Sequence, residues 1–383
     1  MTHRTWMLGT MAALGLLCTP AWAGDITIGV ILSATGPAAS LGIPEKNTVE
    51  LMPTTLDGHK VNFIILDDAT DTTMAVKNIK KLISENNVDA VIGTTSVTTL
   101  AMREAAVAAE TPIVSMAAPA LLIDPADPKT KWVFKSTQND RLMVSAIIDN
   151  MKRAGIKTAA FIGFADPYGE GWWAEFKKAA DAAGISITAQ ESYNRVDQSV
   201  TGQIAKILSS KPDAVLIGAA GTPAALPQKE LKRRNYKGLI YQTHGAANPD
   251  FLRVGGKDVE GALLPVGPML VYEQLDAANP VRAVGEAYVK RYEEKFGPRS
   301  TFGGHAWDAW LLIANAVPGA LKKGEPGSAE FRRALRDGIE GTKDMIGTHG
   351  VFNMTPEDHS GLDARSRVMV TIKDGKWVVL DKQ

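Results

Sequence analysis

The sequence predicts an α/β protein with two lobes, each built around a mainly parallel β-sheet. Three observations lead to this fold class. Short apolar runs rich in β-branched residues, bounded by turn residues, indicate buried parallel strands. Amphipathic helical patterns separate these runs, as crossover connections require. The alternation restarts at Arg141, and the 360 residues after position 23 suffice for two Rossmann-like domains of ordinary size.

The first series of elements spans residues 26 to 116. Asp71 is a candidate N-cap for a helix over 72–85, in which Ala75, Ile79 and Leu82 form one apolar stripe. An Ala-rich amphipathic helix follows over 98–110. The strands of this series are expected at 26–32, 61–66, 90–93 and 113–116.

The second series spans residues 141 to 242 and repeats the alternation. We expect its helices at 141–154, 170–183, 200–209 and 224–234, and its strands at 159–164, 185–189, 214–217 and 239–242. Three later helices are expected at 281–296, 305–321 and 329–338. The last two apolar runs, 368–372 and 377–380, flank a turn at Asp374-Gly375 and predict a closing β-hairpin.

A single linker between the lobes would leave the three late helices unplaced. We therefore expect the chain to cross between the lobes more than once, near residues 135–136, 264–266 and 346–350. These crossings assign the chain to an N-terminal lobe, residues 24–136 plus 266–346, and a C-terminal lobe, residues 137–265 plus 347–383.

The first 23 residues have the pattern of a secretory signal peptide. A short segment with one positive charge, Arg4, precedes a mostly apolar stretch over 5–18, and Ala21-Trp22-Ala23 supplies the small residues of a cleavage site. The apolar stretch is too short to cross a bilayer core of about 30 Å comfortably. We expect cleavage after Ala23 and export to the periplasm. A lipid anchor at Cys18 is the alternative, but Leu17 is larger than the residue expected before a lipidated cysteine.

Composition excludes several function classes for the exported chain. Cys18 is the only cysteine, so the chain after Ala23 has no disulfide and no thiol chemistry. Arg4 is the only charged residue of the signal segment, so cleavage reduces the 42 basic residues to 41, against 42 acidic ones. A net charge near −1 gives no general attraction to nucleic acid or to anionic membranes. No apolar stretch after the signal is long enough to span a membrane.

The sequence gives little support to the hypothesis that the protein is an enzyme. The six histidines show no metal-ligand spacing, and neither a Gly-x-Ser-x-Gly elbow nor a phosphate-binding glycine loop is present. Asp67, Asp68 and Asp71 form an acidic cluster that we interpret as a strand end and a helix cap rather than a metal site. We therefore expect no catalysis, no cofactor and no metal.

The order and spacing of several short motifs resemble one protein family. The motifs are Ile28-Gly29-Val30 followed by Ser33-Ala34-Thr35-Gly36-Pro37, Asp67-Asp68, Val91-Ile92-Gly93 with Ser96, Pro112-Ile113-Val114-Ser115, Asp166 with Tyr168-Gly169, Gly245 with Asn248, and Trp307-Asp308-Ala309. Together they resemble the type I periplasmic solute-binding proteins of ABC importers, above all the branched-chain amino acid (Leu/Ile/Val) receptors. The resemblance spans residues 25 to 380. It implies two lobes joined by a three-crossing hinge, and a monomeric receptor that closes on a small molecule and docks to an inner-membrane permease.

The ligand site is expected where the parallel strands end, because ligands of open α/β sheets bind at the carboxyl ends of their strands. This rule selects the loops over 33–41, 94–98, 115–119, 166–168, 219–222 and 243–247. We expect ligand contacts from nine residues, of which Phe302 alone lies outside these loops: Leu41, Thr95, Ser96, Ala117, Ala118, Tyr168, Gly221, His244 and Phe302.

Ser96 is the strongest candidate among them. It precedes the helix expected from Thr98, and a helix N-terminus offers free N–H groups and a partial positive charge to a carboxylate. The resemblance implies that hydroxyl and amide groups here hold the ligand carboxylate; the alternative is that Ser96 only caps the helix. The resemblance also assigns backbone contacts to Ala117 and Ala118, and a cleft position to Tyr168. The alternatives are tight packing for the alanines and a surface turn for the tyrosine.

Two positions depart from the family pattern. His244 stands where amino-acid receptors place an acid that pairs with the ligand ammonium, and Pro119 stands where they place a threonine. Proline offers neither a hydroxyl nor an N–H, and a protonated histidine repels an ammonium. We therefore expect a carboxylate ligand without an amine, such as an aromatic or 2-oxo acid. A neutral amino acid held by backbone carbonyls or Tyr168 is one alternative, and a ligand-sensing module for a signalling partner is another.

Overall fold

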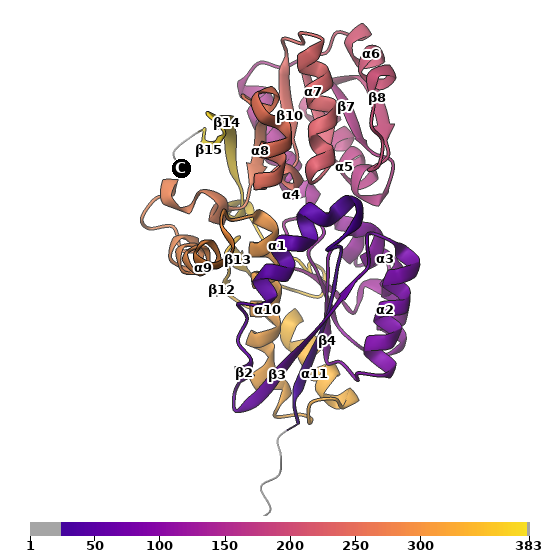
Figure 1. Ribbon diagram of the computed structural model, residues 1–383, viewed down its shortest axis with the longest axis vertical. Coiled ribbons are helices and arrows are strands. Elements are labelled where there is room, and N and C mark those ends of the chain that lie inside the picture. The colour runs from indigo at the N-terminus through magenta and orange to yellow at the C-terminus, as the bar shows by residue number, and fades with distance from the viewer. Residues whose placement is uncertain (1–23, 381–383) are drawn as a thin grey trace, which may run out of the picture.

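The computed structural model describes residues 24–380, and it confirms the predicted fold class. Two α/β lobes lie one above the other along the long axis of the molecule, the first drawn mainly in indigo and the second mainly in magenta (Figure 1). The expected signal peptide, residues 1–23, lies outside the described residues. Within residues 24–380, no helix combines the length and the apolar content that crossing a membrane requires.

The first lobe contains a six-stranded sheet in the order β2-β3-β1-β4-β5-β6. Every pair is parallel except the antiparallel β2 and β3. The strands are β1 Ile26–Leu32, β2 Thr55–Leu56, β3 His59–Asp67, β4 Ala90–Gly93, β5 Ile113–Ser115 and β6 Val133–Lys135.

Helices cover both faces of this sheet, which explains why its central strands are apolar along their whole length. On β1, Ile28 and Val30 pack against α10 Thr301–Ala320 and α11 Ala329–Glu340. Ile31, which points to the opposite face, packs against α2 Thr72–Ser84 and α3 Ser96–Ala108. Asp71 caps α2 as expected, because its carboxylate accepts from the Met74 N–H at 2.7 Å.

The second lobe contains a seven-stranded sheet in the order β15-β14-β11-β10-β9-β7-β8. The expected final hairpin is present at one edge: β15 pairs antiparallel with β14, and β14 pairs antiparallel with β11. The strands are β7 Thr158–Phe164, β8 Ser186–Tyr193, β9 Ala214–Gly218, β10 Leu239–Gln242, β11 Leu263–Val266, β14 Val368–Lys373 and β15 Lys376–Val379.

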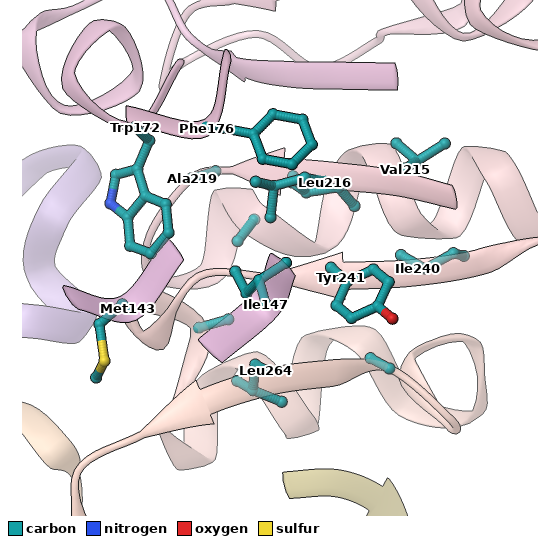
Figure 2. Packing of buried hydrophobic residues seen from close by; sticks show 14 of the residues in the cluster. Met143, Ile147, Trp172, Phe176, Val215, Leu216, Ala219, Ile240, Tyr241 and Leu264 are labelled. Carbon is teal, nitrogen blue, oxygen red and sulfur yellow. The ribbon is translucent and has the colours of Figure 1, made fainter. Parts of the chain in front are cut away.

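Five helices cover this second sheet. Helices α4 Asp140–Arg153 and α5 Pro167–Ala183 pack together on one face, and α6 Thr201–Ser209, α7 Ala225–Arg233 and α8 Pro249–Gly255 lie over the other (Figure 1). In Figure 2, Phe176 of α5 lies over Leu216 of β9, and Trp172, Ile147 and Tyr241 belong to the same cluster of buried side chains.

Helix α1, Ala39–Val49, is the main element that the sequence did not predict. Part of this segment was expected to be a loop, because Gly42 and Pro44 disfavour a helix and the apolar residues form no stripe. Gly42 is needed for packing: a Cβ atom there would lie 2.2 Å from the Ser33 carbonyl oxygen. The other unpredicted elements, which include α8, β6 and the pair β12 Met345–Ile346 and β13 Val351–Phe352, are too short to show a periodicity.

The segments that connect the lobes lie against one another. Gln138, after β6, donates to the Ser366 carbonyl oxygen at 2.7 Å, shortly before β14. Gly267, after β11, packs so closely on His349 that a Cβ atom would lie 2.0 Å from its ring. Residues Phe352, Met354 and Leu362 pack in the core of the first lobe, and β14 of the second sheet begins at Val368. The lobe boundaries that we drew at 136, 265 and 346 stay predictions.

Two positions on α5 test the packing of the second lobe. Phe176 is fully buried, and we expect Phe176→Ala to lower the free energy of unfolding by about 3–5 kcal/mol through lost burial and the cavity left behind. Lys178, two residues further along α5, is exposed, so Lys178→Ala should change the free energy of unfolding by about 0.5 kcal/mol or less. Urea unfolding of both variants measures the difference; equal values for the two would contradict this packing.

Candidate functional site

A small cavity lies between the lobes, where the carboxyl ends of both sheets meet. The space in it that the centre of a water molecule can reach is about 20 Å³, close to the minimum for a single water. Its lining comes from both lobes and consists of Leu41, Thr94, Thr95, Ser96, Met116, Ala117, Ala118, Tyr168, Arg195, Ala220, His244, Gly245, Phe302 and His305.

A larger hollow of about 980 Å³ adjoins the cavity and shares Arg195 with it. It is an open surface groove lined largely by charged and polar side chains of the second lobe, including Lys229, Glu230 and Asp258. The smaller cavity is the better candidate site, because it lies at the strand ends and holds buried polar atoms that lack partners.

The structure brings together eight of the nine residues predicted as ligand contacts. Gly221 is the exception: it adjoins the cavity without lining it, and its N–H donates to the Gly245 carbonyl at 2.8 Å. The eight that line the cavity are Leu41, Thr95, Ser96, Ala117, Ala118, Tyr168, His244 and Phe302. Their contact with a ligand stays a prediction.

Ser96 is the first residue of α3, and its hydroxyl is free of a capping role. Thr95 is the N-cap instead, and its hydroxyl oxygen accepts from the Thr98 N–H at 3.4 Å. The Ser96 Oγ is buried and has no hydrogen-bond partner within the described part of the chain. The alternative that Ser96 serves only as a cap is therefore wrong, and its hydroxyl lies at a helix N-terminus that favours anions.

Tyr168 is held inside the cleft by hydrogen bonds. Its hydroxyl lies 2.8 Å from the Thr243 hydroxyl, which donates to the Ala219 carbonyl at 2.6 Å. Only 6% of Tyr168 is exposed, which excludes the surface-turn alternative, and burial raises the pKa of its phenol. The ring therefore presents a neutral hydroxyl beside the cavity.

His244 lies in a short turn after β10 and is 3% exposed. Burial lowers the pKa of its ring to about 3, with a smaller contribution from the charge of Lys135. Its Nδ1 has no hydrogen-bond partner among residues 24–380. The ring packs 5.6 Å from Trp172 and 6.3 Å from His305, measured between centroids. At neutral pH, His244 is an uncharged group with a free ring nitrogen.

Lys135 lies behind the cavity, at the end of β6. Its buried ammonium group donates to the Ala118 carbonyl, to the Pro119 carbonyl at 3.4 Å and to Asn139 Oδ1 at 2.5 Å. These bonds fix the loop that presents Ala117 and Ala118 to the cavity. Burial lowers the pKa of Lys135 to about 7.

Sequence reasoning missed Arg195 and His305. Arg195 follows β8, which we expected to end at residue 189; the strand continues to Tyr193, and the strand-end rule applied there selects Arg195. Its Nε donates to Asp166 Oδ2 at 2.6 Å, and its guanidinium lies 4.2 Å from the Phe164 ring centroid. His305 lies inside α10, where that rule does not apply.

A buried chain of polar groups lies behind His305. Asp308 Oδ2 is 3.2 Å from His349 Nδ1, and His349 Nε2 is 3.1 Å from the Thr301 hydroxyl. This order, acid, imidazole and hydroxyl, resembles a catalytic triad. Thr301 is fully buried and does not line the cavity, so its hydroxyl cannot reach a substrate there.

The carboxyl groups near the cavity do not face it. Glu45 accepts from the Thr94 hydroxyl at 3.0 Å, and burial raises the pKa of its carboxyl well above the ordinary value. Asp68 accepts from the Ser33 hydroxyl at 2.6 Å, and burial raises its pKa too. In the part of the chain that the structure describes, no three His, Cys, Asp or Glu side chains gather as metal ligands.

The sequence matches the family model described as "Periplasmic binding protein" over residues 25–376. A protein of Brucella melitensis biotype 1 named "Leu/Ile/Val-binding protein homolog 3" is 24% identical over 367 residues, which cover 93% of this chain and 94% of that protein.

Solved structures with the same fold match nearly the whole chain. An extracellular ligand-binding receptor from Rhodopseudomonas palustris HaA2 is 44% identical, with a TM-score of 0.90, and covers 93% of this chain and 99% of its own. Two more distant structures share the fold with TM-scores of 0.78 and coverage of 93% of this chain. One is a branched-chain amino acid binding protein of Streptococcus pneumoniae in complex with isoleucine (20% identity, 99% of that chain), and the other is a solute-binding protein of R. palustris in complex with benzoate (22%, 96%).

The lowered pKa of His244 predicts a specific loss of stability in acid. Between pH 6.5 and pH 3 the unfolded chain binds a proton at this histidine and the folded chain does not, so the free energy of unfolding falls as the pH falls. From pH 6.5 to 4.5, the wild type should lose about 2–3 kcal/mol more than His244→Gln. Urea unfolding at both pH values measures this. Parallel pH profiles for wild type and His244→Gln would refute the effect.

Proposed function

The chain belongs to the periplasmic binding protein family, and we propose that it captures a small carboxylate-bearing solute without an amine, with aromatic and 2-oxo acids preferred. As a member of this family it is a ligand-binding receptor and not an enzyme. Further parts of the proposal are export by cleavage after Ala23, action as a monomer, and delivery of the solute to an inner-membrane permease of an ABC importer. Because the isoleucine and benzoate complexes share only 20% and 22% identity with this chain, the proposed ligand rests on the residues of the cleft.

One observation carries the proposal: none of the described residues that line the cavity is Asp or Glu. A buried α-ammonium without a carboxylate partner would lose its hydration and gain little in return. His244, at the position where an acid was expected, is uncharged at neutral pH.

A carboxylate is accommodated much better than an ammonium. The N-terminus of α3 and the free Ser96 hydroxyl offer donors from the first lobe. Arg195 lines the cavity from the second lobe and offers guanidinium N–H donors, and its charge is balanced by the ion pair with Asp166. Lys135, whose pKa is lowered to about 7, adds positive potential from behind the loop of Ala117 and Ala118 when it is protonated.

Aromatic rings around the cavity support an aromatic or planar acid. Phe302 and His305 lie 6.4 Å apart between ring centroids, and His244 continues the row 6.3 Å further on. Tyr168 lies on the other side of Trp172, at 6.3 Å. Offset and edge-on contacts of this kind suit a flat ligand.

Binding requires the lobes to move apart and close again. The lobes touch at the mouth of the cleft, where the Thr222 N–H of the second lobe donates to the Ser40 hydroxyl of α1 at 3.3 Å. A cavity with room for about one water cannot admit a larger solute from this state. The ligand therefore enters an open form and stabilises the closed one through contacts with both lobes.

A neutral amino acid is the second candidate. The name of the Brucella relative favours it, and backbone carbonyls or Tyr168 would then hold the ammonium. A sensing role, in which the same closure is read by a signalling partner, uses the same cleft and differs only in the partner.

A thermal-shift panel on the protein without residues 1–23 tests the ligand class. We expect aromatic or 2-oxo acids to raise the melting temperature, because a ligand at a hundredfold excess over its Kd adds about 2.7 kcal/mol of stability. Acetate serves as the control for ionic effects. A large shift with leucine, isoleucine or valine, and none with amine-free acids, would show that the receptor takes amino acids.

A matched pair of glycines tests closure. Gly221 and Gly256 share similar backbone angles, with φ of 66° and 53°. A Cβ atom at Gly221 would lie 2.6 Å from Ser40 Oγ and 2.7 Å from Leu41 Cδ1 across the cleft, whereas one at Gly256 meets nothing within 4 Å. We expect Gly221→Ala to weaken the binding of the panel's best acid by about tenfold or more, a loss of about 1.4 kcal/mol, and Gly256→Ala to leave it unchanged. Calorimetric titration measures both; equal affinities would mean that the lobes need not meet here.

A further inference from the structure

His305 is a second histidine of the cavity, and it comes from the first lobe. It is 1% exposed, and its Nδ1 has no hydrogen-bond partner in the described chain. Whether that nitrogen is a donor or an acceptor depends on where the single proton of the neutral ring lies. The buried chain behind His305 decides this.

The proton positions follow from Asp308. A carboxylate only accepts, so His349 Nδ1, 3.2 Å from Asp308 Oδ2, must carry a proton. The neighbouring Thr348 hydroxyl agrees with this assignment: it donates to the Gly304 carbonyl at 3.2 Å and turns a lone pair toward His349 Nδ1 at 2.9 Å.

The next link is the Thr301 hydroxyl. With the ring proton of His349 on Nδ1, Nε2 is bare and accepts from the Thr301 hydroxyl at 3.1 Å. A hydroxyl has one proton, so Thr301 can only accept from its other neighbour, His305 Nε2, at 3.5 Å. His305 Nε2 therefore carries the proton of that ring.

His305 Nδ1 is then a bare acceptor. Burial holds the pKa of His305 well below its usual range, so the ring does not take a second proton at neutral pH. A buried acceptor without a partner is unfavourable, and a ligand that supplies a donor removes that cost.

We propose that His305 Nδ1 accepts a hydrogen bond from a hydroxyl group of the ligand, so that the preferred solute is a hydroxylated carboxylate. This inference rests on the proposed function for the carboxylate. A hydroxyl is a neutral donor, whereas an ammonium would need an acid that the described lining of the cavity lacks. The N-terminus of α3 binds the carboxylate and α10 binds the hydroxyl, so the first lobe contacts both groups before the cleft closes.

The tautomer of His305 is measured directly by NMR. Histidine labelled with ¹⁵N distinguishes a protonated ring nitrogen from a bare one, and pH 8 lies well above the ordinary histidine pKa of about 6.5. We expect a proton on His305 Nε2 and none on Nδ1 in the unliganded protein. A proton on Nδ1 would overturn the inference whatever the receptor binds.

Matched acids measure the preference. Calorimetric titration compares benzoate with 2-, 3- and 4-hydroxybenzoate, and pyruvate with lactate. We expect at least one hydroxylated acid to bind about tenfold tighter than its partner. If the plain acids bind as well as all the hydroxylated ones, the hydroxyl inference is wrong and the proposed function stands. If no acid binds and leucine does, the proposed function itself is wrong.

A matched pair of variants tests the relay. Thr301→Val keeps the shape of the side chain and removes the hydroxyl, while Thr301→Ser keeps the hydroxyl. We expect Thr301→Val to reduce the hydroxyl preference to about threefold or less, with binding of the plain acid retained, and Thr301→Ser to preserve the preference. An undiminished preference in Thr301→Val, or its loss in Thr301→Ser, would show that the Thr301 hydroxyl does not set the tautomer.

Discussion

The ammonium group of Lys135 joins three parts of the molecule at one point. It extends from the last strand of the first sheet, binds the carbonyls of Ala118 and Pro119 in the cleft, and binds Asn139 at the start of the first helix of the second lobe. A buried charge is tolerated only where hydrogen bonds replace its hydration, so the loop and the helix are held in one arrangement around it. The shape of the cleft floor and the geometry of the first crossing thus depend on the same group. Neutralising Asp140 nearby, whose pKa is raised by burial, would leave this ammonium without its main countercharge.

The sequence predicted the fold and most of the cleft because both follow from strand periodicity. Once the parallel strands were located, the rule that ligands bind at their carboxyl ends led to seven of the eight predicted contacts that line the cavity; the eighth, Phe302, lies outside the loops that the rule selects. The misses have physical causes. Arg195 was missed because the exposed face of β8 is polar beyond residue 189, which hid the last four residues of the strand. His305 was missed because a helix residue reaches a cleft through tertiary packing, which no local pattern records. Helix α1 was missed because close packing on Ser33 requires Gly42, a residue that disfavours helices.

The ionisable groups around the cleft differ in charge according to their position. The two histidine rings that line the cavity, His244 and His305, are uncharged at neutral pH because they are buried. The buried carboxyl groups of Glu45 and Asp68 have raised pKa values and sit behind hydroxyl groups. The cationic groups of the site are Lys135, whose pKa burial lowers to about 7, and Arg195, which forms an ion pair with Asp166. The described residues that line the cavity therefore include no carboxylate that would repel an anion.

The unpartnered atoms in the cavity influence how strongly the receptor discriminates between similar solutes. Ser96 Oγ, His244 Nδ1 and His305 Nδ1 are all buried without partners when the lobes meet. Each such group costs about 1–3 kcal/mol when it is left unmatched. A near-analogue of the right size that lacks one matching group inherits that cost, so it is discriminated against even though it fits. Selectivity of this kind comes from the rejection of incomplete molecules more than from attraction to the right one.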